Sequence, residues 1–120
     1  MVVEDDPALR EFYRAALAAA GHYVEAVGDG GSALQLIDSG TMPATVVLDM
    51  GLPYVSGRDV LNELRAQPAT CRIPVVVVSG TDVRDVKVQK WDAILRKPVT
   101  ADALIDTVSE CLQRAALLFP

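Results

Sequence analysis

Short apolar runs and amphipathic stretches alternate along the chain. The runs that have the length of strands lie at 2–3, 23–27, 45–48, 74–78 and 93–95. Those at 45–48 and 74–78 are apolar at almost every position, which predicts strands buried on both faces. The run at 2–3 is almost too short for a strand, and a complete first strand would need residues ahead of Met1.

Between these runs, apolar residues recur at helical spacing. Helices are expected from Pro7 to the residue before Gly21, over 32–39, over 56–67, and from Thr100 onwards. The inward face of the first helix is expected to carry Leu9, Phe12, Ala16, Leu17 and Ala20. Asp6 and Thr100 precede two of these helices and are suitable N-caps. A segment at 82–89 could form another helix, but its valines make it a weak one.

This alternation predicts an α/β fold with the pattern (βα)5. Parallel strands need crossover helices, and right-handed crossovers place helices on both faces of the sheet. The length of 120 residues is that of one domain, and no repeat or linker divides the chain.

Composition and charge exclude several classes of protein. Apolar residues make up 51% of the chain and charged residues 22%, which excludes intrinsic disorder. No apolar run has the length of a membrane span, and no signal peptide is visible. The net charge of −5 argues against nucleic-acid binding by this chain. Cys71 and Cys111 lack metal-ligand spacing, so we expect a reduced cytoplasmic protein.

Polar residues follow the predicted strands where each one ends. Glu4, Asp5 and Asp6 follow the first strand and Asp49 the third, whereas Ser79 and Lys97 follow the fourth and the fifth. In an open α/β sheet, the carboxyl ends of the strands form the ligand-binding crevice. We therefore expect carboxylates, a hydroxyl and an amine to converge at one edge.

Such a cluster has a definite chemistry. Neighbouring carboxylates repel one another, and a hard divalent cation such as Mg²⁺ relieves the repulsion through oxygen ligands. A lysine and a serine hydroxyl can stabilise a phosphoryl group, and an aspartate can accept one as an acyl phosphate. The residues thus predict a Mg²⁺-dependent aspartyl-phosphorylation site.

With these motifs in order, the whole chain resembles a receiver (response-regulator) domain of bacterial two-component signalling. The motifs that carry the resemblance are Val2 to Pro7, Val47 to Pro53 with Gly57, Val78-Ser79-Gly80, and Lys97-Pro98. The resemblance implies a flavodoxin-like three-layer sandwich, with a five-stranded parallel sheet in the order 2-1-3-4-5.

The resemblance also implies roles for single residues. Asp49 is the expected phosphoacceptor, Ser79 the switch hydroxyl, and Lys97 the phosphate-binding cation. The expected Mg²⁺ ligands, which could also take Mn²⁺, are Glu4, Asp5, Asp49 and the backbone carbonyl of Gly51. The bond between Lys97 and Pro98 is expected to be cis.

Three departures from the family pattern fall close together. Lys97 follows Ser79 by 18 residues, fewer than is common in the family, so the fourth helix is expected to be shortened or irregular. Ile94 stands where many members carry an aromatic residue, and Gly80 replaces a common alanine. We expect intact phosphorylation chemistry with an atypical output surface.

The leading hypothesis is a signalling switch that takes a phosphoryl group from a sensor histidine kinase or a phosphotransfer protein. It would catalyse only its own phosphorylation and dephosphorylation. One alternative is a degenerate receiver that acts as an interaction module. Another is a Mg²⁺-dependent phosphohydrolase, but Gly51 stands where such enzymes carry a second acid.

The output partner cannot be named from the sequence. The apolar ending Leu117-Leu118-Phe119 suggests a fragment of a longer protein, such as a DNA-binding regulator or a hybrid histidine kinase. A homodimer could form through the face made by the fourth helix, the fifth strand and the fifth helix.

Overall fold

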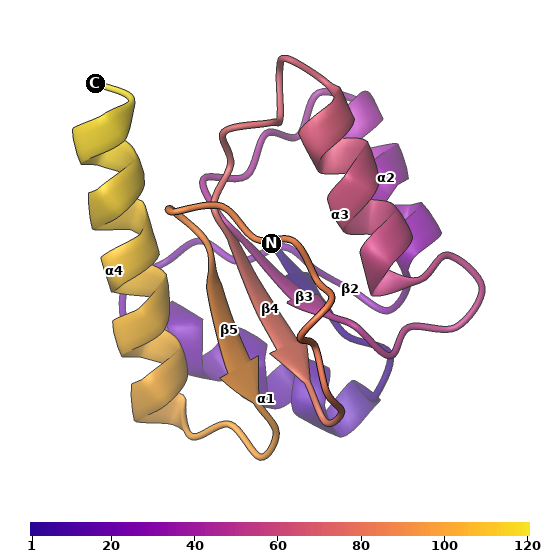
Figure 1. Ribbon diagram of the computed structural model, residues 1–120. Coiled ribbons are helices and arrows are strands. Elements are labelled where there is room, and N and C mark those ends of the chain that lie inside the picture. The colour runs from indigo at the N-terminus through magenta and orange to yellow at the C-terminus, as the bar shows by residue number, and fades with distance from the viewer.

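A five-stranded parallel sheet lies at the centre of the structure, a computed structural model that describes residues 1–120 (Figure 1). In chain order the elements are β1 (Val2–Val3), α1 (Pro7–Ala19), β2 (Ala26–Val27), α2 (Gly30–Asp38), β3 (Val46–Asp49), α3 (Gly57–Ala66), β4 (Val75–Ser79), β5 (Ala93–Arg96) and α4 (Ala101–Leu118). The strand order is β2-β1-β3-β4-β5 and every neighbouring pair is parallel. The predicted order is confirmed.

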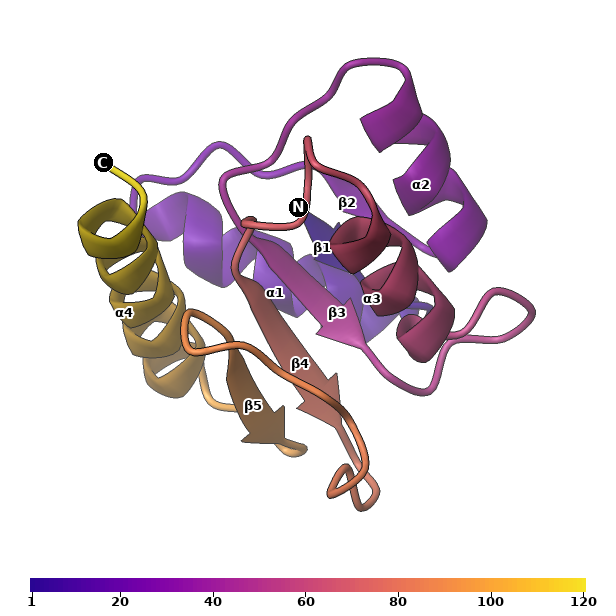
Figure 2. The same cartoon turned by 45° about the horizontal axis from the view of Figure 1, so that its top comes forward.

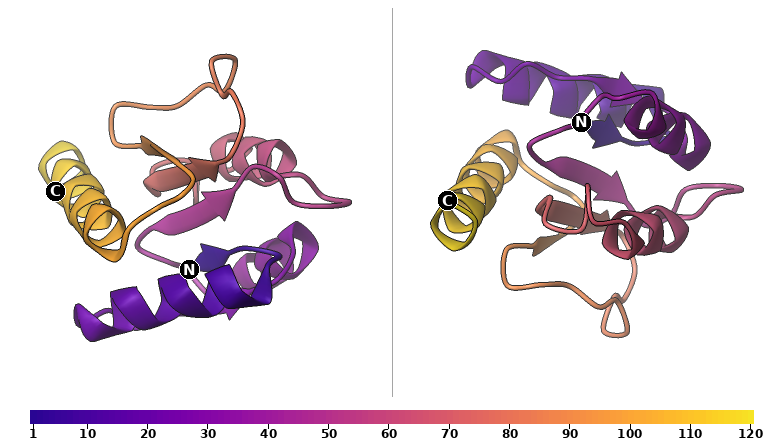
Figure 3. Two further views of the ribbon diagram at one scale, coloured as in Figure 1. Left: turned by 90° about the horizontal axis from the view of Figure 1, so that it is seen from below. Right: turned by 90° about the horizontal axis from the view of Figure 1, so that it is seen from above.

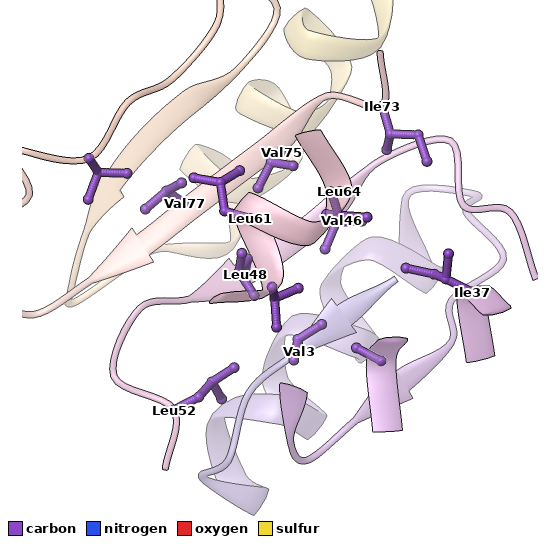
Figure 4. Close-up of a cluster of buried hydrophobic side chains, with 13 residues drawn as sticks. Val3, Ile37, Val46, Leu48, Leu52, Leu61, Leu64, Ile73, Val75 and Val77 are labelled. Atoms are coloured by element: carbon purple, nitrogen blue, oxygen red, sulfur yellow. The ribbon is translucent and has the colours of Figure 1, made fainter. Parts of the chain in front are cut away.

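Helices cover both faces of the sheet, two on each (Figure 3). The valines of β4 show how the layers arise, because successive side chains point to opposite faces. Val75 and Val77 pack towards α2 and α3, in the cluster drawn in Figure 4, whereas Val76 and Val78 pack towards α1 and α4. A strand buried on both faces must be apolar at every position, as the sequence of β4 is.

Side-chain caps fix where the helices begin. The Asp6 carboxylate accepts hydrogen bonds from the backbone N–H groups of Ala8 and Leu9, and Thr100 caps α4. Helix α2 begins at Gly30, two residues earlier than predicted, because Asp29 is its N-cap. A Cβ atom on Gly30 would lie 2.7 Å from the carbonyl oxygen of Val55, so only glycine fits there.

Two predictions about the first helix and the second strand were wrong in detail. Tyr13, not Phe12, is the buried aromatic residue of α1: it is 1% exposed, whereas Phe12 is 41% exposed. Strand β2 forms only over Ala26–Val27. Of the residues before it, Glu25 still accepts a backbone hydrogen bond from Val2 of β1, at 2.8 Å. Tyr23 is fully at the surface.

The expected fourth helix does not form. Residues 80–92 connect β4 to β5 through two isolated turns and no helix, as the open orange segment of Figure 2 shows. The predicted irregularity of this connection is confirmed, although it goes as far as the loss of the helix, so that α4 corresponds to the fifth helix of the (βα)5 pattern. Val83 and Val86 still pack on the core, while Val88 is exposed. The face proposed for a homodimer accordingly lacks the first of its two helices and keeps β5 and α4.

A buried ion pair holds this irregular connection in place. The Asp92 carboxylate accepts two hydrogen bonds from the Arg65 guanidinium of α3, at 2.5 and 2.6 Å. It also accepts from the backbone N–H groups of Val75 and Gln89, at 2.8 and 2.7 Å. The pair thus joins the end of α3, the start of β4 and the start of β5.

Candidate phosphorylation site

All the residues predicted for the site meet at the carboxyl edge of the sheet. They line a cavity of about 370 Å³. Its wall is formed by Glu4, Asp5, Asp6, Leu9, Asp49, Met50, Gly51, Ser79, Gly80, Thr81 and Lys97. Segments that lie far apart in the sequence come together here because β1, β3, β4 and β5 are parallel neighbours.

Three carboxylates form the acidic half of the site. Glu4, Asp5 and Asp49 each place an oxygen within 4.8 Å of the other two. Glu4 and Asp49 are buried and Asp5 is exposed. Burial raises the pKa of Glu4 above its ordinary value, and the neighbouring Asp49 adds to this, whereas the hydrogen bond from Lys97 opposes it.

The pKa of Asp5 moves the other way. Its slight burial would raise the pKa, but hydrogen bonding with the carboxyl groups of Glu4 and Asp49 outweighs this and lowers it. The pKa values of these two neighbouring carboxyl groups are thus shifted in opposite directions, that of Glu4 upwards and that of Asp5 downwards. A cluster of three carboxylates that offers only oxygen ligands fits a hard divalent cation, which would relieve the repulsion between them.

Lys97 supplies the positive charge of the site. Its Nζ atom donates to Glu4 Oε1 at 2.8 Å and lies 3.5 Å from Asp49 Oδ1. Burial acts to lower the pKa of Lys97, but the hydrogen bond to Glu4 and the charge of Asp49 together raise it. The peptide bond between Lys97 and Pro98 is cis, as predicted.

Asp49 is held at the end of β3 by close backbone packing. The backbone N–H of Gly51 donates to Asp49 Oδ1 at 3.0 Å. Helix α3 begins directly against the same residue, because Gly57 has no side chain. A Cβ atom on Gly57 would lie 2.3 Å from the Asp49 carbonyl oxygen and 2.7 Å from the Met50 Cα. Gly57 is thus a geometric requirement of the site.

The Ser79 hydroxyl is hydrogen-bonded within its own loop. Its Oγ atom accepts from the backbone N–H of Thr81 at 3.1 Å and lies 3.2 Å from both the carbonyl oxygen and the hydroxyl of Thr81. Sequence reasoning missed Thr81, although its place two residues after Ser79 is typical of a local hydroxyl turn.

Arg10 is a second residue that sequence reasoning missed. Its guanidinium donates to the carbonyl oxygen of Glu4 at 3.0 Å and to that of Asp5 at 3.5 Å. The contact ties the first turn of α1 to the acidic loop. In the sequence, Arg10 is marked only by its place in the first turn of the helix that follows Glu4 and Asp5.

The chain matches a known protein family and several of its members. A family model described as "Response regulator receiver domain" matches residues 1–109. The protein named "Response regulator MprA" from Mycolicibacterium vanbaalenii is 35% identical over 95% of this chain and 50% of its own length. A "Putative transcriptional regulator" from Haloferax volcanii is 34% identical over 96% of this chain and 19% of its own length.

Solved structures agree with this. The signal receiver domain of a signal transduction histidine kinase from Syntrophus aciditrophicus aligns with a TM-score of 0.83 and 28% identity, over 94% of this chain and 88% of that one. NtrX from Brucella abortus aligns with a TM-score of 0.84 and 28% identity, over 98% of this chain and 28% of that one. The chain spans about half the length of the MprA relatives. None of its helices is long and apolar enough to cross a membrane.

Proposed function

Because the chain belongs to the family of response regulator receiver domains, we propose that Asp49 accepts a phosphoryl group in a two-component signalling pathway. The donor would be the phosphohistidine of a sensor histidine kinase or of a phosphotransfer protein. An Asp49 carboxylate oxygen forms the new bond to phosphorus, the phosphorus–nitrogen bond of the donor breaks, and the imidazole leaves with its electron pair. The product is an acyl phosphate.

The observation that carries this proposal is the environment of Asp49. The carboxylate ends a buried apolar strand yet lies among two acids, a lysine and an open cavity. A buried carboxylate is costly unless it is paired with a positive charge, hydrogen-bonded or bound to a metal ion. Glu4, Asp5, Asp49 and the Gly51 carbonyl would hold Mg²⁺, which when bound would neutralise negative charge on the transferring group.

Lys97 and Ser79 would then act on the phosphoryl oxygens. The Lys97 ammonium lies beside Asp49 and would exchange its bond to Glu4 for one to a phosphoryl oxygen. The Ser79 hydroxyl would leave Thr81 and turn towards the new group. Phosphorylation adds a charge of about −1.5 to −2, which biases the loop after Ser79 between two arrangements.

We further propose that the domain turns over no free substrate. Gly51 offers no carboxyl group two residues after Asp49, so a general acid for a leaving group is missing at that place. In this account the protein acts in the cytoplasm. The state of residues 80–92 would be read by a partner or by another part of a longer chain.

The experiment is intact-mass spectrometry after incubation with a small phosphodonor, such as acetyl phosphate. Wild-type protein and Asp49→Asn are compared with and without Mg²⁺. A gain of one phosphoryl group that needs both Asp49 and Mg²⁺ supports the proposal. Equal labelling of Asp49→Asn contradicts it. Thr45→Ser, a conservative change at the opposite edge of the sheet, serves as the control variant.

A further inference from the structure

Tyr13 of α1 carries a buried hydroxyl that has no hydrogen-bond partner. The residue is 1% exposed, and its side chain extends from α1 into the cluster formed with α4 and the sheet. Two other buried side-chain atoms lack partners, Arg65 Nε and Trp91 Nε1, and both can only donate. The Tyr13 oxygen is therefore the one unpartnered buried side-chain atom that can accept. A phenylalanine would fill the same space without an unpaired polar atom.

Tyr13 shares its packing neighbours with the residues that line the site. Leu9, one helical turn earlier on the same face of α1, lines the cavity together with Lys97. Leu95 and Val99, the residues two positions before and after Lys97, pack against the cluster that contains Tyr13. Val2, two positions before Glu4, belongs to the same cluster.

The electrostatics agree with this placement. Burial raises the pKa of Tyr13, and the charges that act on the phenol are those of Lys97 first, then Glu4, Asp49 and Asp6. The influence is mutual, since Tyr13 in turn contributes to the raised pKa of Lys97. Three of the four charges that shift the pKa of this α1 side chain belong to Lys97, Glu4 and Asp49 of the site.

Lys97 needs a further acceptor if it changes partners. In this structure one of its three N–H donors is bonded to Glu4, with Asp49 at a longer distance. If Glu4 binds a metal ion, its hydrogen bond with Lys97 would open and would leave the half-buried ammonium short of an acceptor. A phenol oxygen can accept from an ammonium and donate to a carboxylate at the same time.

We propose that Tyr13 is a positioning residue for Lys97: its hydroxyl accepts a hydrogen bond from Lys97 Nζ when the ammonium leaves Glu4 for a phosphoryl oxygen on Asp49. This inference rests on the proposed function. It predicts an asymmetric effect for Tyr13→Phe. The hydroxyl makes no hydrogen bond in the unphosphorylated domain. Its removal should therefore leave the free energy of unfolding of that state unchanged or higher. The same change weakens the state that resembles the phosphorylated one.

The test uses Mg²⁺ with beryllofluoride, a tetrahedral mimic of the phosphoryl group. Tyr13→Phe is compared with wild type and with Tyr23→Phe, a matched control whose residue is 90% exposed. Wild type and Tyr23→Phe are expected to bind beryllofluoride equally, and Tyr13→Phe to bind it on the order of tenfold more weakly, the loss of one hydrogen bond to a charged group. The unfolding temperature of Tyr13→Phe without ligand should equal or exceed that of wild type.

The outcomes separate the two proposals. If wild type binds beryllofluoride and Tyr13→Phe binds it equally well, the role of Tyr13 is overturned and the proposed function stands. If wild type fails to bind it, both fall. A second readout is the rate at which the Lys97 ammonium protons exchange with solvent in the beryllofluoride complex, followed through the nitrogen-15 resonance. We expect this exchange to be faster in Tyr13→Phe than in wild type. An unchanged exchange rate would mean that the hydroxyl does not hold the lysine.

Discussion

Asp92 and Arg65 allow a quantitative test of how the connection between β4 and β5 is held without a helix. The Asp92 side chain is fully buried and that of Arg65 is 16% exposed. Asp92→Ala would leave the guanidinium without its counter-charge and the backbone N–H groups of Val75 and Gln89 without an acceptor. Arg65 would keep the carbonyl oxygens of Cys71 and Ile73, at 3.1 and 3.0 Å.

The magnitude follows from this geometry. Removing one partner of a buried ion pair costs about 3–5 kcal/mol. A domain of this size has a total stability of about 5–15 kcal/mol, so the loss is a large fraction of it. At roughly 4 °C per kcal/mol, the unfolding temperature should fall by about 12–20 °C.

The chain provides its own control. Asp85 pairs with Arg58 at 2.8 Å, but these side chains are 76% and 46% exposed. Asp85→Ala should therefore cost no more than about 1 kcal/mol. Urea and thermal denaturation, followed by circular dichroism, measure both variants. If Asp92→Ala costs no more than Asp85→Ala, the buried pair does not hold the connection.

Further predictions concern the site itself. Gly57→Ala should lower stability by at least about 1–3 kcal/mol, because its Cβ atom would meet the backbone of Asp49, and should slow phosphorylation; unchanged rates from acetyl phosphate would contradict this. Mg²⁺ binding should weaken as the pH falls, starting at a higher pH than an ordinary glutamate would give, because the proton on Glu4 competes with the metal. In the metal-free protein the same raised pKa has the opposite effect, since stability falls as the pH rises from the ordinary glutamate value through the higher folded one. Titrations of wild type and Glu4→Gln check both statements, and identical pH profiles would refute them. Lys97→Met should lower metal-free stability near pH 7, because Glu4 and Asp49 lose their counter-charge, and Mg²⁺ should restore part of it; a thermal shift assay that finds no effect of the metal would oppose this.

Much of the sheet and the site could be predicted from the sequence, for physical reasons. The unbroken apolar runs of β3 and β4 can only be buried on both faces, which fixes them as central strands. Once the strands are parallel, residues that follow them must meet at one edge, which gathers Asp49, Ser79 and Lys97. These conclusions need only periodicity and topology.

Other features depend on tertiary contacts that the sequence does not display. Phe12 and Tyr13 are adjacent aromatics on one helix, and packing against β1 and β3 decided which of them is buried. Nothing in the sequence distinguishes Asp92 from the other acidic residues, because its partner Arg65 lies 27 residues earlier. The three valines of residues 83–88 suggested a weak helix, but the short connection is held instead by Asp92.

The most direct measurement locates the phosphoryl group. Wild-type protein is incubated with acetyl phosphate and Mg²⁺, the acyl phosphate is reduced with borohydride, and the altered residue is found by peptide mass spectrometry. The account predicts reduction at Asp49 alone, and none when Mg²⁺ is removed. Modification at another residue, or labelling that does not need Mg²⁺, would contradict the account.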